Sequence, residues 1–215
     1  MYLPHHFAVD EPSAVAGLIE ACGSAELITF DGTRPVASLL PVLWEPAGPR
    51  LLGHLARANP QWSTVATGSL ALAVVTGPQG YVSPSWYASK AEHGRVVPTW
   101  NYVSVHLTGE LRVHDDPDWV RDVVTRLTER HEAGRAHPWA VDDAPPAYVS
   151  GQLRAIVGIE LIVTSVEAKW KVSQNRGEGD QRSVREALLA EGRADLADAM
   201  PPLTDPHHEG RPPTP

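Results

Sequence analysis

The sequence predicts a mainly β domain with appended helices, an α+β arrangement in which six strands form a closed antiparallel barrel. Six segments carry strand patterns, either alternating apolar and polar residues or an unbroken apolar run. They follow one another in hairpin-like succession, with helical patterns at the start of the chain and after the fifth and sixth strands. Closure into a barrel would also remove the exposed edges of the sheet.

The first elements are a helix and a hairpin. Residues 10–23 have a capping aspartate, a first-turn proline, apolar residues at helical spacing and a terminal glycine. Strands are predicted over 25–30 and 35–44, joined by Asp31-Gly32, which is a strong hairpin signal. Pro41 indicates an edge or a bulge in the second strand, because proline cannot donate a hydrogen bond to a neighbouring strand.

Three more strands are predicted in the middle of the chain. Residues 50–55 form a short strand, and Asn59-Pro60 then reads as the cap and first turn of a short helix whose positive end would face an anion. Residues 69–76 are almost continuously apolar, which indicates a buried strand. Residues 100–113 alternate and have one polar face, and Gly109 allows a bend in that strand.

The last third of the chain adds helices and one strand. A helix begins at Asp116-Pro117, a short helix covers 147–153, and the sixth strand covers 155–169. A helix is also predicted over 183–189 in the more polar region that follows. We therefore expect a barrel domain over 1–176, a C-terminal helical extension over 177–200 and a disordered proline-rich tail over 201–215.

The composition of the 215 residues restricts the class of protein. A hydrophobic content of 42% with 20% charged residues is ordinary for a globular domain. No segment approaches the roughly 18 unbroken apolar residues of a membrane span. The chain begins without the basic and apolar regions of a secretion signal, and its single cysteine, Cys22, has no second cysteine to pair with. We therefore expect a cytoplasmic protein.

The formal net charge of −8 disfavours DNA binding, because duplex binding depends on a basic face that neutralises phosphates. No helix-turn-helix pattern is present. The sequence also lacks a P-loop, a Rossmann fingerprint, a Gly-x-Ser-x-Gly motif and an HExxH motif. Nucleotide hydrolysis, nicotinamide binding in a Rossmann domain and zinc proteolysis are therefore unsupported.

The stretch 80–109 concentrates aromatic and polar side chains between prolines. Trp86, Tyr87 and Trp100 offer stiff contact area with polar tips, which would suit a flat cofactor. The alternative is packing in an aromatic core or at a subunit interface.

Five segments carry a resemblance to a known family. They are GHLARANPQW at 53–62, GPQGYVSPSWY at 77–87, VPTWNYVSVHLTG at 97–109, GI at 158–159 and KVSQNR at 171–176. In this order they resemble the signature blocks of the PaiB-type FMN-binding negative transcriptional regulator family. The resemblance extends over nearly the whole chain.

That resemblance implies a flavin-reductase-like split β-barrel, a homodimer, and a cofactor at the dimer interface. It leaves the activity open, because the family also contains the haem-dependent piperazate synthases, which form an N–N bond in N5-hydroxy-L-ornithine. We therefore expect a haem-dependent enzyme of that kind acting on a small-molecule substrate. The alternative is an FMN-binding regulator or a flavin-dependent redox protein.

The candidate metal ligand is His54, because it ends a strand beside the predicted anion site and a neutral imidazole there could bind haem iron. The alternative is a structural histidine held by hydrogen bonds. The candidate catalytic residues are Lys90, His106 and Tyr87. The candidate cofactor-binding residues are Arg57, Asn59, Trp86, Trp100, Asn101, Gln174, Asn175 and Arg176. Each of the charged residues could instead be a solvated surface group.

Overall fold

The computed structural model describes residues 1–65 and 68–203. The chain divides into two compact units. Unit 1 contains Met1, Val9–Thr76 and Ser104–Ala168, and unit 2 contains Tyr2–Ala8, Gly77–Val103 and the chain from Lys169 onward. Of the predicted tail, positions 204–215 lie outside the described residues.

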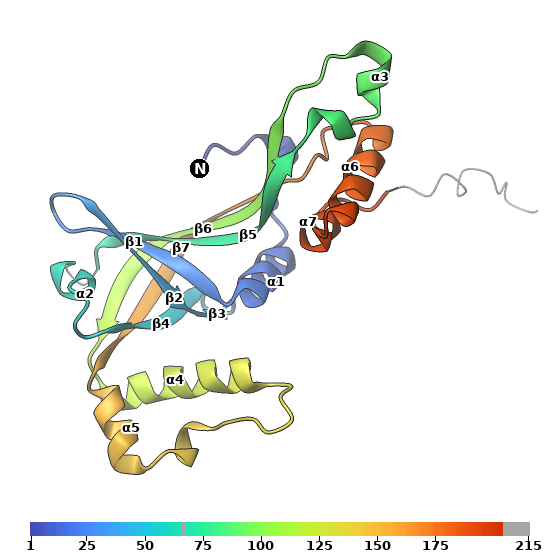
Figure 1. Ribbon diagram of the computed structural model, residues 1–215. Coiled ribbons are helices and arrows are strands. Elements are labelled where there is room, and N and C mark those ends of the chain that lie inside the picture. The colour runs from blue at the N-terminus through green and yellow to red at the C-terminus, as the bar shows by residue number, and fades with distance from the viewer. Residues whose placement is uncertain (66–67, 204–215) are drawn as a thin grey trace, which may run out of the picture. The chain divides into compact units, whose positions relative to one another are not determined.

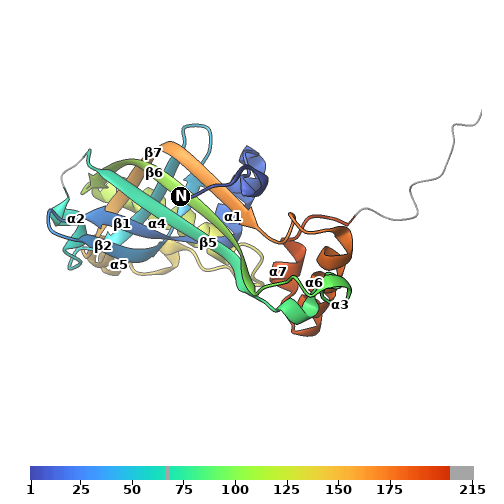
Figure 2. The ribbon, with the colours of Figure 1, turned by 90° about the horizontal axis from the view of Figure 1, so that it is seen from above.

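The strands form one seven-stranded sheet in the order β2-β1-β5-β6-β7-β4-β3. Figure 2 shows the three longest strands, β5, β6 and β7, running side by side. The β1–β2, β1–β5, β3–β4 and β4–β7 pairs are antiparallel, which confirms the predicted antiparallel β class with helices. The bounds are β1 Ser24–Phe30, β2 Pro35–Pro41, β3 Leu43–Glu45, β4 Arg50–Ala56, β5 Leu70–Val82, β6 Thr99–His114 and β7 Ile156–Lys171.

The prediction of six strands in a closed barrel is wrong. The strand predicted over 35–44 divides at Val42, whose N–H turns away to the carbonyl of Gly23 at 2.9 Å. Pro41, the residue before it, has no N–H to offer a ladder. The two resulting strands, β2 and β3, stand at opposite ends of the strand order, so the described sheet is open.

The helices of unit 1 are α1 Pro12–Cys22, α2 Gln61–Thr64, α4 Pro117–Glu132 and α5 Pro146–Leu153, with a 3-10 turn at Val141–Asp143. Glu11 caps α1 in place of the predicted aspartate, and Gly23 ends it with a φ of 65°. Figure 1 shows α4 lying along the strands of this unit. Its apolar residues Val123 and Leu127 pack on Leu43 and Leu52.

Unit 2 contains three α-helices, α3 Ser89–His93, α6 Glu178–Ala190 and α7 Ala194–Asp198, with 3-10 turns at His5–Phe7 and Pro84–Trp86. The helix α6 begins five residues before its predicted start at 183 and contains all of it. Neither α3 nor α7 is predicted from the sequence. Among the described residues, no helix combines the length and apolar character needed to cross a membrane.

Two glycines of unit 1 mark close approaches between elements. A Cβ on Gly109 of β6 would lie 2.1 Å from the carbonyl oxygen of Ile162 on β7. A Cβ on Gly158 of β7 would lie 2.1 Å from the indole of Trp119 on α4. Both positions exclude any side chain, so these glycines set how closely β6, β7 and α4 pack.

Candidate functional site

Unit 2 contains two cavities that share Asn175 and Arg176. The larger, with a volume of about 640 Å³, is the Arg95 cavity. The smaller, of about 150 Å³, is the Tyr87 cavity. The Arg95 cavity is lined by Ala88, Ser89, Glu92, His93, Arg95, Asn175, Arg176, Gly177, Gly179 and Asp180. The Tyr87 cavity is lined by Phe7, Tyr87, Thr99, Asn101, Lys171, Ser173, Asn175 and Arg176.

A tight turn after β7 places the residues shared by the two cavities. Ser173 adopts a φ of 66°, a left-handed conformation that costs a non-glycine residue energy. The buried Asn101 holds it: Asn101 Nδ2 donates to Ser173 Oγ at 2.9 Å, and Ser173 Oγ lies 3.2 Å from Asn101 Oδ1. Gln174 accepts from the N–H of Val172 at 2.8 Å. Asn101 and Gln174 therefore stabilise the turn that presents Arg176.

Tyr87 is the buried aromatic residue of the smaller cavity. Its side chain is 3% exposed, and its hydroxyl has no partner with hydrogen-bond geometry among the described residues. The guanidinium carbon of Arg176 lies 4.7 Å from the ring centroid. Burial raises the pKa of Tyr87, and the positive charge of Arg176, together with its close approach to the Tyr87 hydroxyl, opposes that rise. A buried hydroxyl without a partner costs about 1–3 kcal/mol, so this atom is one that a ligand could satisfy.

Lys171 adds a second cation to the same cavity. Its Nζ donates to Thr99 Oγ1 at 2.6 Å and to the carbonyl of Trp100. Burial lowers the pKa of Lys171, and the positive charges of Lys169 and Arg176 lower it further. An anion bound beside these positively charged side chains would offset their mutual repulsion and favour the charged form of Lys171. Lys171 is not among the predicted site residues, although it opens the KVSQNR segment.

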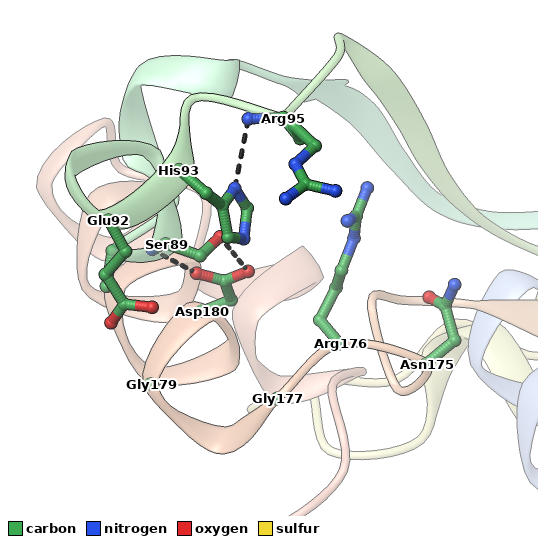
Figure 3. Close-up of a pocket in the computed structure, with 10 residues that line it drawn as sticks. Ser89, Glu92, His93, Arg95, Asn175, Arg176, Gly177, Gly179 and Asp180 are labelled. Carbon is green, nitrogen blue, oxygen red and sulfur yellow. Dashed lines mark hydrogen bonds between the residues drawn. The ribbon is translucent and has the colours of Figure 1, made fainter.

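The larger cavity contains a second arginine. Figure 3 shows the guanidinium groups of Arg95 and Arg176 directed toward one another, with the His93 ring beside them. His93 Nδ1 accepts from the backbone N–H of Arg95 at 3.0 Å, which shapes the loop after α3. In the described part of the chain, neither arginine has a carboxylate within ion-pair distance.

Other predicted residues of unit 2 lie beside these cavities without lining them. The indole of Trp100 is 47% exposed and donates to Gln79 Oε1 at 3.2 Å. Lys90 is exposed and donates to Ser85 Oγ at 3.1 Å. Trp86 is half-buried at the end of a 3-10 turn. Their catalytic or cofactor-binding roles remain predictions.

The predicted anion site of unit 1 already uses its donors within the chain. Arg57 pairs with Asp115 and donates to the carbonyls of Arg154 at 2.8 Å and Ile156 at 3.0 Å. Asn59 donates to Ser38 Oγ at 2.9 Å and accepts from the N–H that follows Pro60 at 2.9 Å. The Arg57 contacts join the end of β4 to the start of β7, and the Asn59 contacts join the short helix to β2, so both residues have a structural role.

His54 lines a cavity of about 300 Å³ in unit 1. The other residues that line it are the apolar Pro41, Val124, Leu127 and Trp139 and the polar Thr128, His131 and Glu132. Burial lowers the pKa of His54, which favours the neutral imidazole. Its Nδ1 is buried and has no hydrogen-bond partner among the described residues. Burial also lowers the pKa of the half-buried His106, which lies on β6 in the same unit. The predicted residues are thus divided between the two units, with His54, Arg57, Asn59 and His106 in unit 1 and the others in unit 2.

The chain belongs to the family described as "Putative FMN-binding domain", whose model matches residues 1–165. Among its relatives is the "Protease synthase and sporulation protein PAI 2" of Bacillus subtilis. The two are 31% identical over 193 residues, which is 89% of this chain and 90% of that protein. The resemblance predicted from the sequence is therefore confirmed.

Solved structures share the fold at lower identity. The flavocytochrome Anf3 from Azotobacter vinelandii is 16% identical, with a TM-score of 0.60, over 77% of this chain and 70% of its own. An FAD and haem binding protein from Mycobacterium smegmatis is 20% identical, with a TM-score of 0.56, over 76% of this chain and 73% of its own. These likenesses concern the fold.

Proposed function

We propose that this protein binds FMN and acts as a flavin-dependent redox protein or regulator. The observation that carries the proposal is the match of residues 1–165 to the FMN-binding family. When bound, FMN supplies reversible electron transfer, while the protein provides binding, orientation and electrostatics. FMN, and not the haem expected from the sequence, is therefore the first cofactor to test.

The residues of the Tyr87 cavity fit the phosphate end of FMN. Lys171 and Arg176 provide positive charge, and the unpartnered hydroxyl of Tyr87 can donate to a phosphate oxygen. A volume of about 150 Å³ is below the roughly 300–1,000 Å³ of pockets that enclose a drug-sized ligand. The proposal is therefore that this cavity holds the phosphate end and that the flavin ring extends beyond it.

The proposed protein partner is a second copy of this chain. One face of β1, β2 and β5 presents Phe30, Leu39 and Leu70 with exposures of 58%, 70% and 72%. The strand register places Ile28 between Ala37 and Leu72 on the same face. The same face also carries the exposed Glu26, opposite Leu39. A largely apolar exposed surface with a polar edge is typical of a protein interface. This surface supports the homodimer.

The direct test of FMN binding is a fluorescence titration with FMN, comparing the Arg176→Ala and Arg182→Ala variants. Loss of one charge-assisted hydrogen bond of about 1.5–3 kcal/mol weakens affinity roughly 10- to 150-fold. Arg176→Ala should show that loss. Arg182→Ala removes an exposed arginine of α6, outside both cavities, and should bind FMN like the wild type. Equal affinities for the two variants would reject this phosphate site.

A haem-dependent activity like that of the piperazate synthases, with N–N bond formation in N5-hydroxy-L-ornithine, is the second candidate. It is supported by the lowered pKa of His54 at its cavity and by fold neighbours described as a flavocytochrome and as an FAD and haem binding protein. However, a metal-bound histidine ordinarily donates its other N–H to an acceptor, and the buried Nδ1 of His54 has none among the described residues. Absorption spectra with added haem test it: a Soret band altered in His54→Ala supports ligation, and an unaltered band excludes it.

A further inference from the structure

We propose that the Arg95 cavity is a second anion site, which binds the carboxylate or phosphate group of a small molecule other than FMN. The proposal rests on the side chains of this cavity and holds whether or not FMN binds. Its central feature is the pair of guanidinium groups that Arg95 and Arg176 direct toward one another (Figure 3).

Two facing guanidinium groups repel each other, because arginine stays protonated at all physiological pH values. Several other arginines have acidic partners: Arg50 pairs with Glu45 and Glu160, and Arg126 pairs with Glu45 and Asp122. In the described residues, Arg95 and Arg176 have no carboxylate within 4.0 Å. An oxyanion between them would accept hydrogen bonds from both planar groups.

The acidic residues of the cavity do not take that place. Asp180 is 8% exposed, and its two carboxylate oxygens accept from the N–H of Ser89 at 2.9 Å and from Ser89 Oγ at 2.8 Å. Asp180 therefore joins α6 to α3 and fixes the wall of the cavity. Glu92 is the other acidic residue on the wall, and its side chain is exposed.

The backbone contributes donors on the same wall. Gly177 and Gly179 lie at the start of α6, a 13-residue helix that no side chain caps and whose first turn also carries the acidic residues Glu178 and Asp180. The free N–H groups of a first helical turn carry partial positive charge and favour an anion. Neither glycine has an atom within 4 Å of where a Cβ would be, so this part of the wall is open.

The size of the cavity indicates a small molecule. Its volume of about 640 Å³ lies within the roughly 300–1,000 Å³ range of pockets for small ligands. Arg176 also lines the Tyr87 cavity, whereas Arg95 lines only the larger one. Arg95 is therefore the residue whose substitution separates the second site from the proposed FMN site.

The test uses calorimetric titration of the full chain, without and with saturating FMN, with inorganic phosphate and with succinate as probes. We compare the wild type with Arg95→Ala, Arg95→Lys and the control Arg182→Ala. Saturable binding of at least one probe is expected, weakened about tenfold or more by Arg95→Ala and partly restored by Arg95→Lys, which keeps the charge without the planar group. Arg182→Ala should match the wild type. FMN affinity should be the same in all four proteins.

Two results would overturn the proposal. One is the absence of saturable binding of both probes to the folded wild type. The other is competition between FMN and phosphate, with Arg95→Ala weakening both ligands equally, because the site would then be that of the flavin's own phosphate. Since Arg95 is exposed, its variants should melt like the wild type. FMN binding without probe binding would reject this proposal alone, and probe binding without FMN binding would reject only the proposed flavin site.

Discussion

Gly109→Ala should destabilise the protein severely. The added methyl group would lie 2.1 Å from the Ile162 oxygen, 2.7 Å from its carbonyl carbon and 2.9 Å from the Cα of Val163. These are backbone atoms of β7, so no side-chain rotation relieves the clash, and β6 and β7 must move apart. Overpacking in a core costs about 1–3 kcal/mol and occasionally more. Because backbone atoms are involved, we expect about 3 kcal/mol or more.

Gly17→Ala is the matched control, because it adds the same methyl group to an open site. Gly17 lies inside α1 with no atom within 4 Å of its added Cβ. Alanine is favoured over glycine inside a helix by roughly 0.5–1 kcal/mol, so this variant should be slightly more stable than the wild type.

The assay is thermal unfolding followed by circular dichroism. For a chain of this size, 1 kcal/mol moves the melting temperature by about 2–4 °C. Gly109→Ala should therefore melt at least about 6 °C below the wild type, and Gly17→Ala about 1–4 °C above it. A Gly109→Ala protein that melts within about 2 °C of the wild type would refute the close approach of β6 and β7.

Four further outcomes are expected. Gln61→Leu should cost about 3 kcal/mol in urea unfolding, because the buried Nε2 of Gln61 shares its two hydrogens among two backbone carbonyls and the Thr29 hydroxyl, which would lose that donor; a cost below about 1 kcal/mol would contradict this. Hydrogen bonds from Thr33 and Arg34 lower the pKa of the Asp31 carboxyl to about 2 in the folded protein, from about 3.9 in the unfolded chain. The ionised carboxyl therefore stabilises the fold above about pH 4, and this stabilisation is lost as the pH falls toward 2. Between these pH values the melting temperature of Asp31→Asn should depend less on pH than that of the wild type, and identical pH profiles would contradict this role of Asp31. The proposed homodimer predicts that Leu39→Lys shifts the light-scattering mass from dimer to monomer, and an equal mass for the variant and the wild type would reject this interface. FMN affinity should fall as alkaline pH neutralises Lys171, and because the pKa of Lys171 is lowered, this fall should occur at a lower pH than for an ordinary lysine. Lys171→Arg should remove the fall. A pH profile of FMN affinity that is the same in Lys171→Arg and in the wild type would exclude Lys171 from the FMN site.

Local signals in the sequence predicted most elements of the fold. Pro12, Gly23 and the Asp31-Gly32 turn act over a few residues, and the structure contains the helix and hairpin that they indicate. The break in the strand at Val42 could not be predicted in the same way, because it depends on a hydrogen bond to Gly23, which is distant in sequence. The strand β5 continues to Val82 through Gly77-Pro78, which reads as a turn when neighbouring strands are unknown.

The candidate site was predictable only in part. The KVSQNR segment led to Arg176, and the aromatic stretch led to Tyr87, and both line the smaller cavity. Lys171 could be recognised only from its position beside Thr99, which comes from another strand. For Arg57 the sequence suggested a ligand where the structure shows contacts within the chain. An arginine before a predicted helix suggests an anion site, but the guanidinium of Arg57 donates to carbonyls of residues nearly 100 positions later.

The most direct test of the central claim is a titration of the purified protein with FMN, monitored by flavin absorption and fluorescence. We expect saturable binding of FMN that is weakened at least about tenfold in Arg176→Ala and unchanged in Arg182→Ala. A protein that remains folded yet shows no saturable binding of FMN would contradict the proposal.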